Sequence, residues 1–176
     1  MSGFCGAWQI EDWARRIQRK PRPEDFEPLT WALYELGLKI KATDYLLAWQ
    51  DLQKFSRELA QFFIRYDIWL TPAITRPPVP IGSFQPEAGR PLEMLKETRG
   101  FSPFTMIPSV AGRPSMSVPL FWNEEGLPIG SHCTGRCGDE ATLFRLAAQL
   151  ETARPWAQRR PVLAERPNVP ENALNF

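Results

Sequence analysis

The sequence has few of the side chains from which enzymes usually build a catalytic or metal centre. Among 176 residues there is one histidine, His132, and there are three cysteines, at positions 5, 133 and 137. One imidazole excludes any site that needs two histidines. An odd, sparse set of cysteines gives no disulfide framework and favours a reducing, cytoplasmic setting.

Strong net charge and long apolar runs are also missing. The formal net charge is +1, which provides no electrostatic footprint for nucleic acid or an anionic membrane. No apolar run approaches the roughly 20 residues of a membrane-spanning helix. The first residues contain acids and tryptophans where a secretory signal has a basic start and an apolar stretch. We therefore expect no nucleic-acid partner, no membrane association and a cytoplasmic location.

The stretch "HCTGRC" invites a zinc hypothesis. Zinc is held by four protein ligands, or by three and a water, and only Cys5 could join His132, Cys133 and Cys137. If 128–134 is a strand, His132 and Cys133 point to opposite faces. We expect buried free cysteines and no metal site. There is no phosphate-binding or dinucleotide-binding glycine motif either, so no cofactor is expected.

The sequence also has few residues that could form a nucleophilic catalytic site. A serine triad would have to use His132, and no serine lies in a G-x-S-x-G turn. A cysteine–histidine pair could draw only on Cys5 or Cys137. The residues alone assign no catalytic side chain.

What the chain does contain is enough apolar material for a core. It is 43% hydrophobic, with seven tryptophans and eleven phenylalanines, and its length fits one domain. Helices are expected over about 8–17, 27–37 (ended by Gly37), 44–65 (capped by Thr43), 90–99 and 140–153 (capped by Asp139). In the longest of these, an apolar stripe is formed by Leu52, Phe55, Leu59 and Phe62.

Strand signals are fewer. Short runs at 68–71 and 115–121 and a third at 127–135 read as strands, with Gly126 in the turn between the last two. The Pro- and Gly-rich stretch 76–90 reads as an extended loop. Three prolines leave 101–114 ambiguous between loop and short helix.

The order of these motifs resembles the amidase signature family. "FTMIPSVAGRPSMSVPLFWNEEGLPIGSHCTGRCGDEATLFRLAAQLETARPW" is similar to the family's F-T-x-x-x-N-x-x-G-x-P-A-x-S-x-P, G-L-P-x-G-x-Q and G-R-x-x-D-E patterns with a closing P-W. "YDIWLTPA" resembles its Y-D-x-x-L-x-P strand. The resemblance runs from about residue 27 to 156. His132 stands where the family often has Gln, and Ser109 and Ser115 replace its usual Asn and Ala.

The resemblance implies an α/β fold, in which helices pack on a few strands of a mixed sheet, and hydrolysis of amide bonds by a Ser–cisSer–Lys triad. This sequence has no two adjacent serines, and none of its five lysines lies in the family's context. We therefore expect 1–176 to be a single incomplete domain, the C-terminal part of an amidase, inactive alone, with 157–176 forming a surface tail.

Under this hypothesis the chain contributes the wall of a pocket for a small-molecule amide. Thr71 and Pro72, at the end of a strand, and Cys5 are the predicted substrate-binding residues. A complementary N-terminal chain or a homo-oligomer would complete the sheet at an exposed edge strand, 68–71 or 115–121. Two alternatives remain open: a non-catalytic interaction module, and a member of the amidotransferase A-subunit branch.

Overall fold

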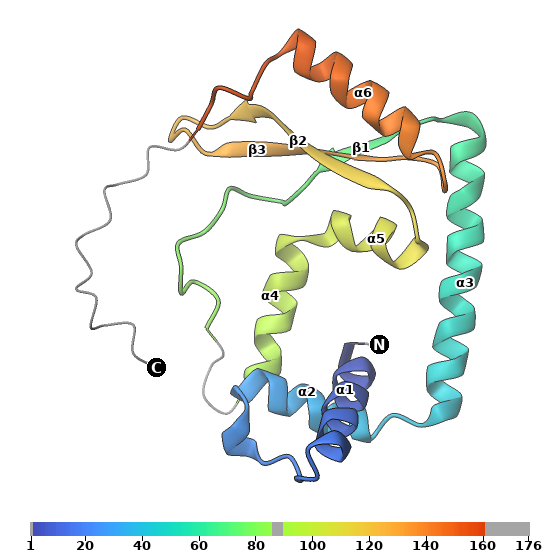
Figure 1. The fold of residues 1–176 in the computed structure, drawn as a ribbon, viewed down its shortest axis with the longest axis vertical. Helices are drawn as coiled ribbons and strands as arrows, with labels where there is room; N and C mark the ends of the chain where they lie inside the picture. Colours follow the sequence, from blue (N-terminus) through green and yellow to red (C-terminus); the bar gives the residue numbers. More distant parts are fainter. Residues whose placement is uncertain (1, 86–89, 161–176) are drawn as a thin grey trace.

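A helical pair and a small sheet lie at opposite ends of the structure, a computed structural model that describes residues 2–85 and 90–160 (Figure 1). The helices are α1 (Ser2–Arg16), α2 (Pro28–Leu38), α3 (Ala42–Arg65), α4 (Met94–Phe101), α5 (Pro103–Ala111) and α6 (Glu140–Ala153), with short 3-10 turns η1 (Pro23–Asp25) and η2 (Pro91–Glu93). The strands are β1 (Trp69–Pro72), β2 (Ser115–Trp122) and β3 (Pro128–Thr134).

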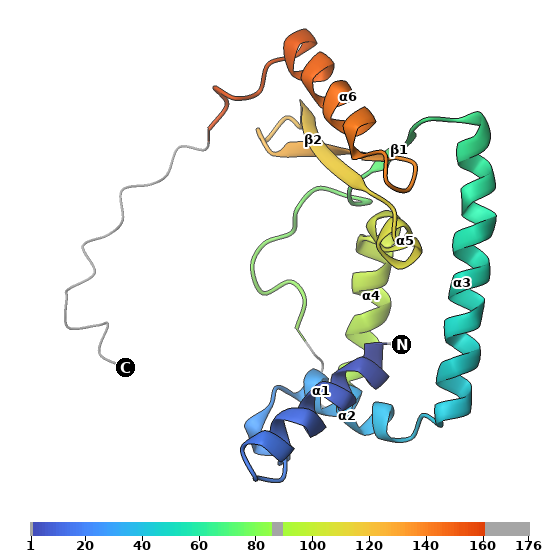
Figure 2. The ribbon, with the colours of Figure 1, turned by 45° about the vertical axis from the view of Figure 1, so that its right-hand side comes forward.

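The sheet has the order β1-β3-β2, and both pairs are antiparallel. The α/β class and the three predicted strands are confirmed, and the two strands predicted as edges do form the edges of this sheet. The turn before β3 depends on Gly126, whose φ of 78° favours glycine. Helix α6 covers one face of the sheet, and α5 lies on the other side (Figures 1 and 2).

Helix α3 runs beside α4 and α5 toward the sheet and packs against α5 (Figure 2). Its buried side chain is Phe63, only 1% exposed, whereas the predicted stripe residues Phe55 and Phe62 are 38% and 36% exposed. The predicted apolar stripe is therefore wrong near the end of the helix. The residue that faces inward there is Phe63, one position after the predicted Phe62. The reason is the contact with α5, where the Ser56 hydroxyl donates to the Ala111 carbonyl at 2.9 Å and fixes which face turns inward.

Two predicted helix ends are also corrected. The N-cap of α3 is Lys41, in an extended conformation, and Thr43 lies inside the helix. Gly37 is buried within α2, which continues to Leu38. Gly37 is not among the glycines with positive φ, so it does not provide the left-handed residue that ends many helices.

Most of the ambiguous stretch 101–114 is helical, because α5 covers Pro103–Ala111. Helix α5 ends at Gly112, whose φ of 64° is left-handed, and Arg113 N–H donates back to the Pro108 carbonyl at 2.9 Å. This is the glycine C-cap that commonly closes a helix. Asp139 is the N-cap of α6 as predicted, and its carboxylate accepts a hydrogen bond from the Thr142 hydroxyl at 2.8 Å.

Candidate functional site

A row of polar side chains crosses the middle of the sheet. Thr71 on β1, His132 on β3 and Ser117 on β2 are cross-strand partners, so their side chains share one face. The Thr71 hydroxyl lies 3.2 Å from Nδ1 of His132. His132 is only 6% exposed, and burial lowers the pKa of its imidazole because the charged form is poorly solvated there. The row therefore holds a neutral imidazole beside a hydroxyl at neutral pH.

Gly130, two residues before His132 on β3, is closely packed by neighbouring side chains. A Cβ added at Gly130 would lie 2.6 Å from the Ser117 hydroxyl oxygen and 2.9 Å from Cβ of Ala73. Ala73 N–H also donates to the Gly130 carbonyl at 3.0 Å. A side chain at this position of β3 would force Ser117 of β2 and Ala73, the residue after β1, to shift. The end of β1, where the predicted pocket residues lie, is thereby held against the sheet.

Pro72 is exposed and lines a cavity of about 260 Å³ at the end of β1. The other walls come from the Pro-rich segment 74–78 and from the first residues of β3, Pro128 to Gly130. This lining is mostly apolar, with Thr75 and Arg76 as its polar members. The cavity can hold a small group and offers a hydroxyl and a guanidinium to a polar ligand.

The three residues predicted to bind substrate occupy three different surroundings. Thr71 and Pro72 are successive residues of a strand, so their side chains point to opposite faces, Thr71 toward His132 and Pro72 toward the cavity. Cys5 belongs to α1, at the end of the molecule away from the sheet (Figure 1), and its side chain lies outside the described residues. The structure thus brings Thr71 together with His132, a partner that the sequence did not suggest.

Two cysteines of the zinc hypothesis, Cys133 and Cys137, are free thiols. Cys133 is buried and Cys137 is exposed, and burial raises the pKa of the Cys133 thiol. Within 2–85 and 90–160, no group of three or more histidines, cysteines and carboxylates is placed to hold a metal ion. Cys133 fills core space on the face of the sheet opposite His132.

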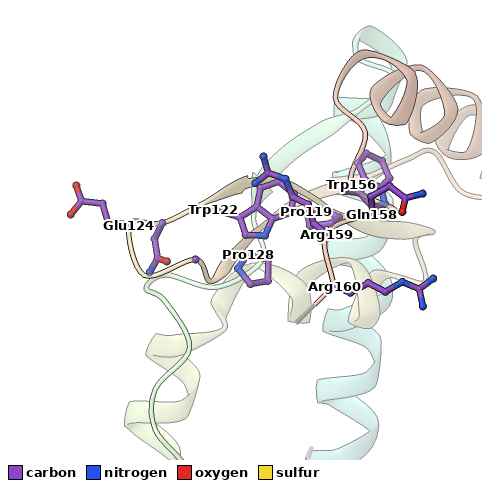
Figure 3. A pocket seen from close by; sticks show the side chains of 10 residues that line it. Pro119, Trp122, Glu124, Pro128, Trp156, Gln158, Arg159 and Arg160 are labelled. Atoms are coloured by element: carbon purple, nitrogen blue, oxygen red, sulfur yellow. The ribbon is translucent and has the colours of Figure 1, made fainter. Parts of the chain in front are cut away.

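A second, larger pocket of about 690 Å³ lies beside the turn between β2 and β3 (Figure 3). The guanidinium of Arg159 stacks 4.1 Å from the ring centroid of Trp122, and Trp156 and Pro119 are among the other residues that line the pocket. Glu124, in the turn, points away from the other labelled side chains (Figure 3). No sequence motif indicated this pocket, because it forms only when the segment after α6 folds back over the hairpin.

The predicted surface tail 157–176 falls on described residues only at 157–160, all four of which are exposed; residues 161–176 lie outside the described part. In the described ranges, none of the helices combines the length and apolar character that crossing a lipid bilayer requires.

Comparison with known proteins identifies the family. The family model named Amidase matches residues 6–144, which is most of the chain. The chain belongs to the amidase family.

Relatives in this family are much longer. The putative amidase AmiC of Mycobacterium tuberculosis H37Rv is 30% identical over 170 residues, which is 96% of this chain and 34% of AmiC. Among solved structures, 6-aminohexanoate cyclic dimer hydrolase has a TM-score of 0.84 and 25% identity, over 91% of this chain and 34% of the hydrolase. The A-subunit of the Thermotoga maritima glutamyl-tRNA(Gln) amidotransferase has a TM-score of 0.51 and 27% identity, over 83% of this chain and 28% of the amidotransferase chain.

The chain spans about a third of the length of AmiC. Among the residues that the structure describes, the hydroxyl of Thr71 is hydrogen-bonded to the imidazole of His132. Amide hydrolysis needs an activated nucleophile and donors placed for the oxyanion. The geometry here offers a hydroxyl beside a buried imidazole on one face of the sheet and a mostly apolar cavity at Pro72.

Proposed function

We propose that this chain forms the substrate-side wall of an amide-hydrolysing enzyme, and that the groups that attack the carbonyl belong to amidase sequence outside these 176 residues. The match of the amidase family model over residues 6–144 carries this proposal. The absence of two adjacent serines from the sequence supports the second half of it, because the family resemblance implies a Ser–cisSer–Lys triad.

Within this wall we assign binding roles to Thr71 and Pro72. Pro72 supplies apolar surface to the cavity at the end of β1, which suits the carbon portion of a small amide. Thr71 offers a hydroxyl whose direction is set by His132. Cys5 stays a weaker candidate, because its helix lies away from the sheet. The free thiols of Cys133 and Cys137 agree with a reducing, cytoplasmic setting.

An amide-hydrolysis assay tests the proposal. The chain is compared, on a panel of aliphatic and aryl amides, with a fusion in which it replaces the matched 34% of AmiC. We expect turnover by the fusion and none by the chain alone. Turnover by the chain alone would show that the attacking group lies within these residues and would refute the proposal.

Substitutions in the fusion test whether Thr71 belongs to the proposed binding wall. In the fusion, T71V should raise KM more than it lowers kcat, because a binding contact is lost while the reacting groups stay in place. The matched control is T152V on α6, an exposed threonine whose hydroxyl bonds only to its own helix, and it should leave both constants unchanged. Unaltered kinetics in the T71V fusion would remove Thr71 from the site.

The amidotransferase alternative has weaker support. The likeness to the amidotransferase chain has a TM-score of 0.51 against 0.84 for the cyclic dimer hydrolase, and the net charge of +1 provides no basic surface for RNA.

A further inference from the structure

The pocket of about 690 Å³ beside the turn between β2 and β3 has no part in the proposed function (Figure 3). One of its walls is the segment after α6, and a turn shapes this segment, because the N–H of Arg159 donates to the Trp156 carbonyl at 2.9 Å. The segment is also held against β2, since the guanidinium of Arg154 lies 4.5 Å from the ring centroid of Phe121. The pocket is therefore bounded by two segments that contact each other at more than one point.

Trp122 orients the guanidinium of Arg159. The guanidinium carbon lies 4.1 Å from the ring centroid, within the range of a cation–π contact. The ring covers only one face of the guanidinium, so the N–H groups at its edge can still donate to a ligand. In the described part of the chain, the Arg159 side chain forms no ion pair and no hydrogen bond. Arg159 therefore offers an oriented fork of donors to an anion.

The charge around this fork is positive. Arg160 also lines the pocket, and it too takes part in none of the ion pairs between described residues. Glu124 is the one carboxylate among the described lining residues, and it points away from the other labelled side chains (Figure 3). A ligand in the pocket meets two guanidinium groups without a facing carboxylate, which favours an anion.

The available donors suit a carboxylate better than a phosphate. Phosphate sites commonly add backbone N–H groups to the side-chain donors. In the turn beside the pocket, the N–H of Gly126 already donates to the Asn123 carbonyl, and the N–H of Asn123 to the Leu127 carbonyl, both at 3.0 Å. The N–H of Leu127 donates to Oδ1 of Asn123 at 2.8 Å. What remains is the guanidinium fork, whose planar geometry matches the two oxygens of a carboxylate.

The other walls of the pocket are rings. Pro119, Pro128, Trp122 and Trp156 all belong to the lining, and surfaces of this kind pack against a planar hydrocarbon group. The pocket is also separate from the cavity at Pro72, because Pro128 is the one residue that the two described linings share. The ligand that fits combines a carboxylate with an aromatic ring.

We propose that this pocket binds a small arylalkyl carboxylate, whose carboxylate pairs with the Arg159 fork and whose ring packs against Trp156 and the prolines. Arg160 adds attraction for the negative charge. Binding at this site does not depend on the proposed function. A link between the two does rest on it, since hydrolysis of an arylalkyl amide releases a carboxylate of this class.

Titration with phenylacetate, followed by NMR of the indole N–H signals, tests the site. W122F and W156F assign two signals among the seven tryptophans of the chain. Phenylacetate should shift both signals and saturate them with a Kd of about 1 mM or below. Phenylacetamide, which has no charge, and acetate, which has no ring, should each bind at least about tenfold more weakly. A titration that does not saturate by about 10 mM, or that shifts other indole signals and leaves these two in place, would overturn the proposal.

Variants of Arg159 separate ligand binding from a purely structural role. R159Q should raise the Kd of phenylacetate about tenfold or more, because the charged fork is lost. R159K retains a cation over Trp122 without the fork and should recover only part of the affinity, so a loss in both variants does not come from release of the segment alone. The matched control is R65Q, at an exposed arginine that ends α3, and it should leave the Kd unchanged. Wild-type affinity in R159Q would mean that Arg159 only holds the segment against Trp122, and the proposal would be wrong.

Two further measurements distinguish the alternatives. Tighter binding of phenyl phosphate than of phenylacetate would show that the pocket selects phosphate, and the assigned ligand class would be wrong. Saturable binding of phenylacetate by the chain, together with no amide hydrolysis by the AmiC fusion, would retain this site and refute only the proposed function.

Discussion

The hydroxyl of Thr71 and Nδ1 of His132 lie 3.2 Å apart across the sheet, although the two residues are 61 positions apart in the chain. Because His132 is the only histidine, its titration can be followed without assignment. The contact links a residue of the proposed binding wall to the one side chain that could change charge near neutral pH.

Stability should fall as the pH is lowered through the range in which free histidine titrates. Burial lowers the pKa of His132 in the folded chain, so the unfolded chain binds the extra proton first. The free energy of unfolding is then highest above the unfolded pKa of about 6.5 and declines below it. Denaturant unfolding of the wild type and H132Q between about pH 5 and about pH 7.5 measures this. The variant, which retains a hydrogen-bonding side chain, should show a shallower decline; identical slopes would contradict the assignment.

Removing the Thr71 hydroxyl should destabilise the chain itself. T71V leaves Nδ1 of a buried imidazole without its partner, at a cost of about 1–3 kcal/mol. T71S retains the hydroxyl and should cost clearly less. Thermal unfolding at neutral pH and the NMR titration of the single imidazole check both variants, since the midpoint should move in T71V and stay in T71S.

Gly130 should not tolerate even one methyl group. G130A places a Cβ 2.6 Å from the Ser117 hydroxyl and 2.9 Å from Ala73, and overpacking of this kind costs about 1–3 kcal/mol. G130A/S117A should recover part of the loss, because one of the two contacts is relieved. As a control, G6A on α1 meets nothing within 4 Å and should raise stability by up to about 1 kcal/mol. Chemical denaturation of the four proteins is the measurement, and a neutral G130A would show that β1 does not press on β3.

Arg136 should contribute more stability than its ion pair suggests. Its guanidinium donates to the Phe63 carbonyl through Nε at 3.2 Å and through an Nη at 2.8 Å, at the C-terminal end of α3. R136A should cost about 1–3 kcal/mol, because a carbonyl of the last helical turn loses charged donors. D67A should cost less than about 1 kcal/mol, since Asp67 is 81% exposed and its pair with Arg136 is screened. Equal losses in the two variants would mean that the ion pair is the main contribution.

The ionisation of Tyr34 should be delayed to high pH. Its hydroxyl donates to Glu11 Oε1, joining α2 to α1, and this hydrogen bond, burial and the Glu11 charge raise the pKa of Tyr34 to about 12. The stabilisation should persist below the free tyrosine pKa of about 10 and disappear as the pH rises toward the folded value. Ultraviolet titration of the wild type and E11Q checks this. The late transition should move to lower pH in E11Q, and an unmoved transition would exclude Glu11 as its cause.

The sequence predicted the elements better than it predicted their contacts. The three strands and most helices followed from local patterns, and Gly126 and Asp139 marked a turn and a helix start correctly. Helix α5 could have been recognised from Gly112, its left-handed C-cap, despite Pro108 within it. The inward face of α3 could not, because Phe55, Phe62 and Phe63 are all apolar and only the contact with α5 selects among them.

The candidate site was predictable only in part. A strand ending in Thr71 and Pro72 was expected, together with a second strand containing His132, but pairing register is a property of the folded sheet. Register places His132 opposite Thr71 and sends Pro72 to the other face. The sequence did not predict the pocket beside Trp122 either. Arg159 reaches this pocket from the segment after α6, and the sequence of that segment indicates only a loop.

The strand order β1-β3-β2 implies an order of assembly. Strands β2 and β3 are joined by a tight turn, and their partners Ser115 and Thr134 are 19 positions apart, whereas β1 must reach β3 across 61 positions. Loop closure grows costlier with chain separation, so we expect the hairpin to form early with α6 and β1 to arrive last. The proposed binding wall would then be the final part of the sheet to become rigid, and the first to be released when the chain begins to unfold.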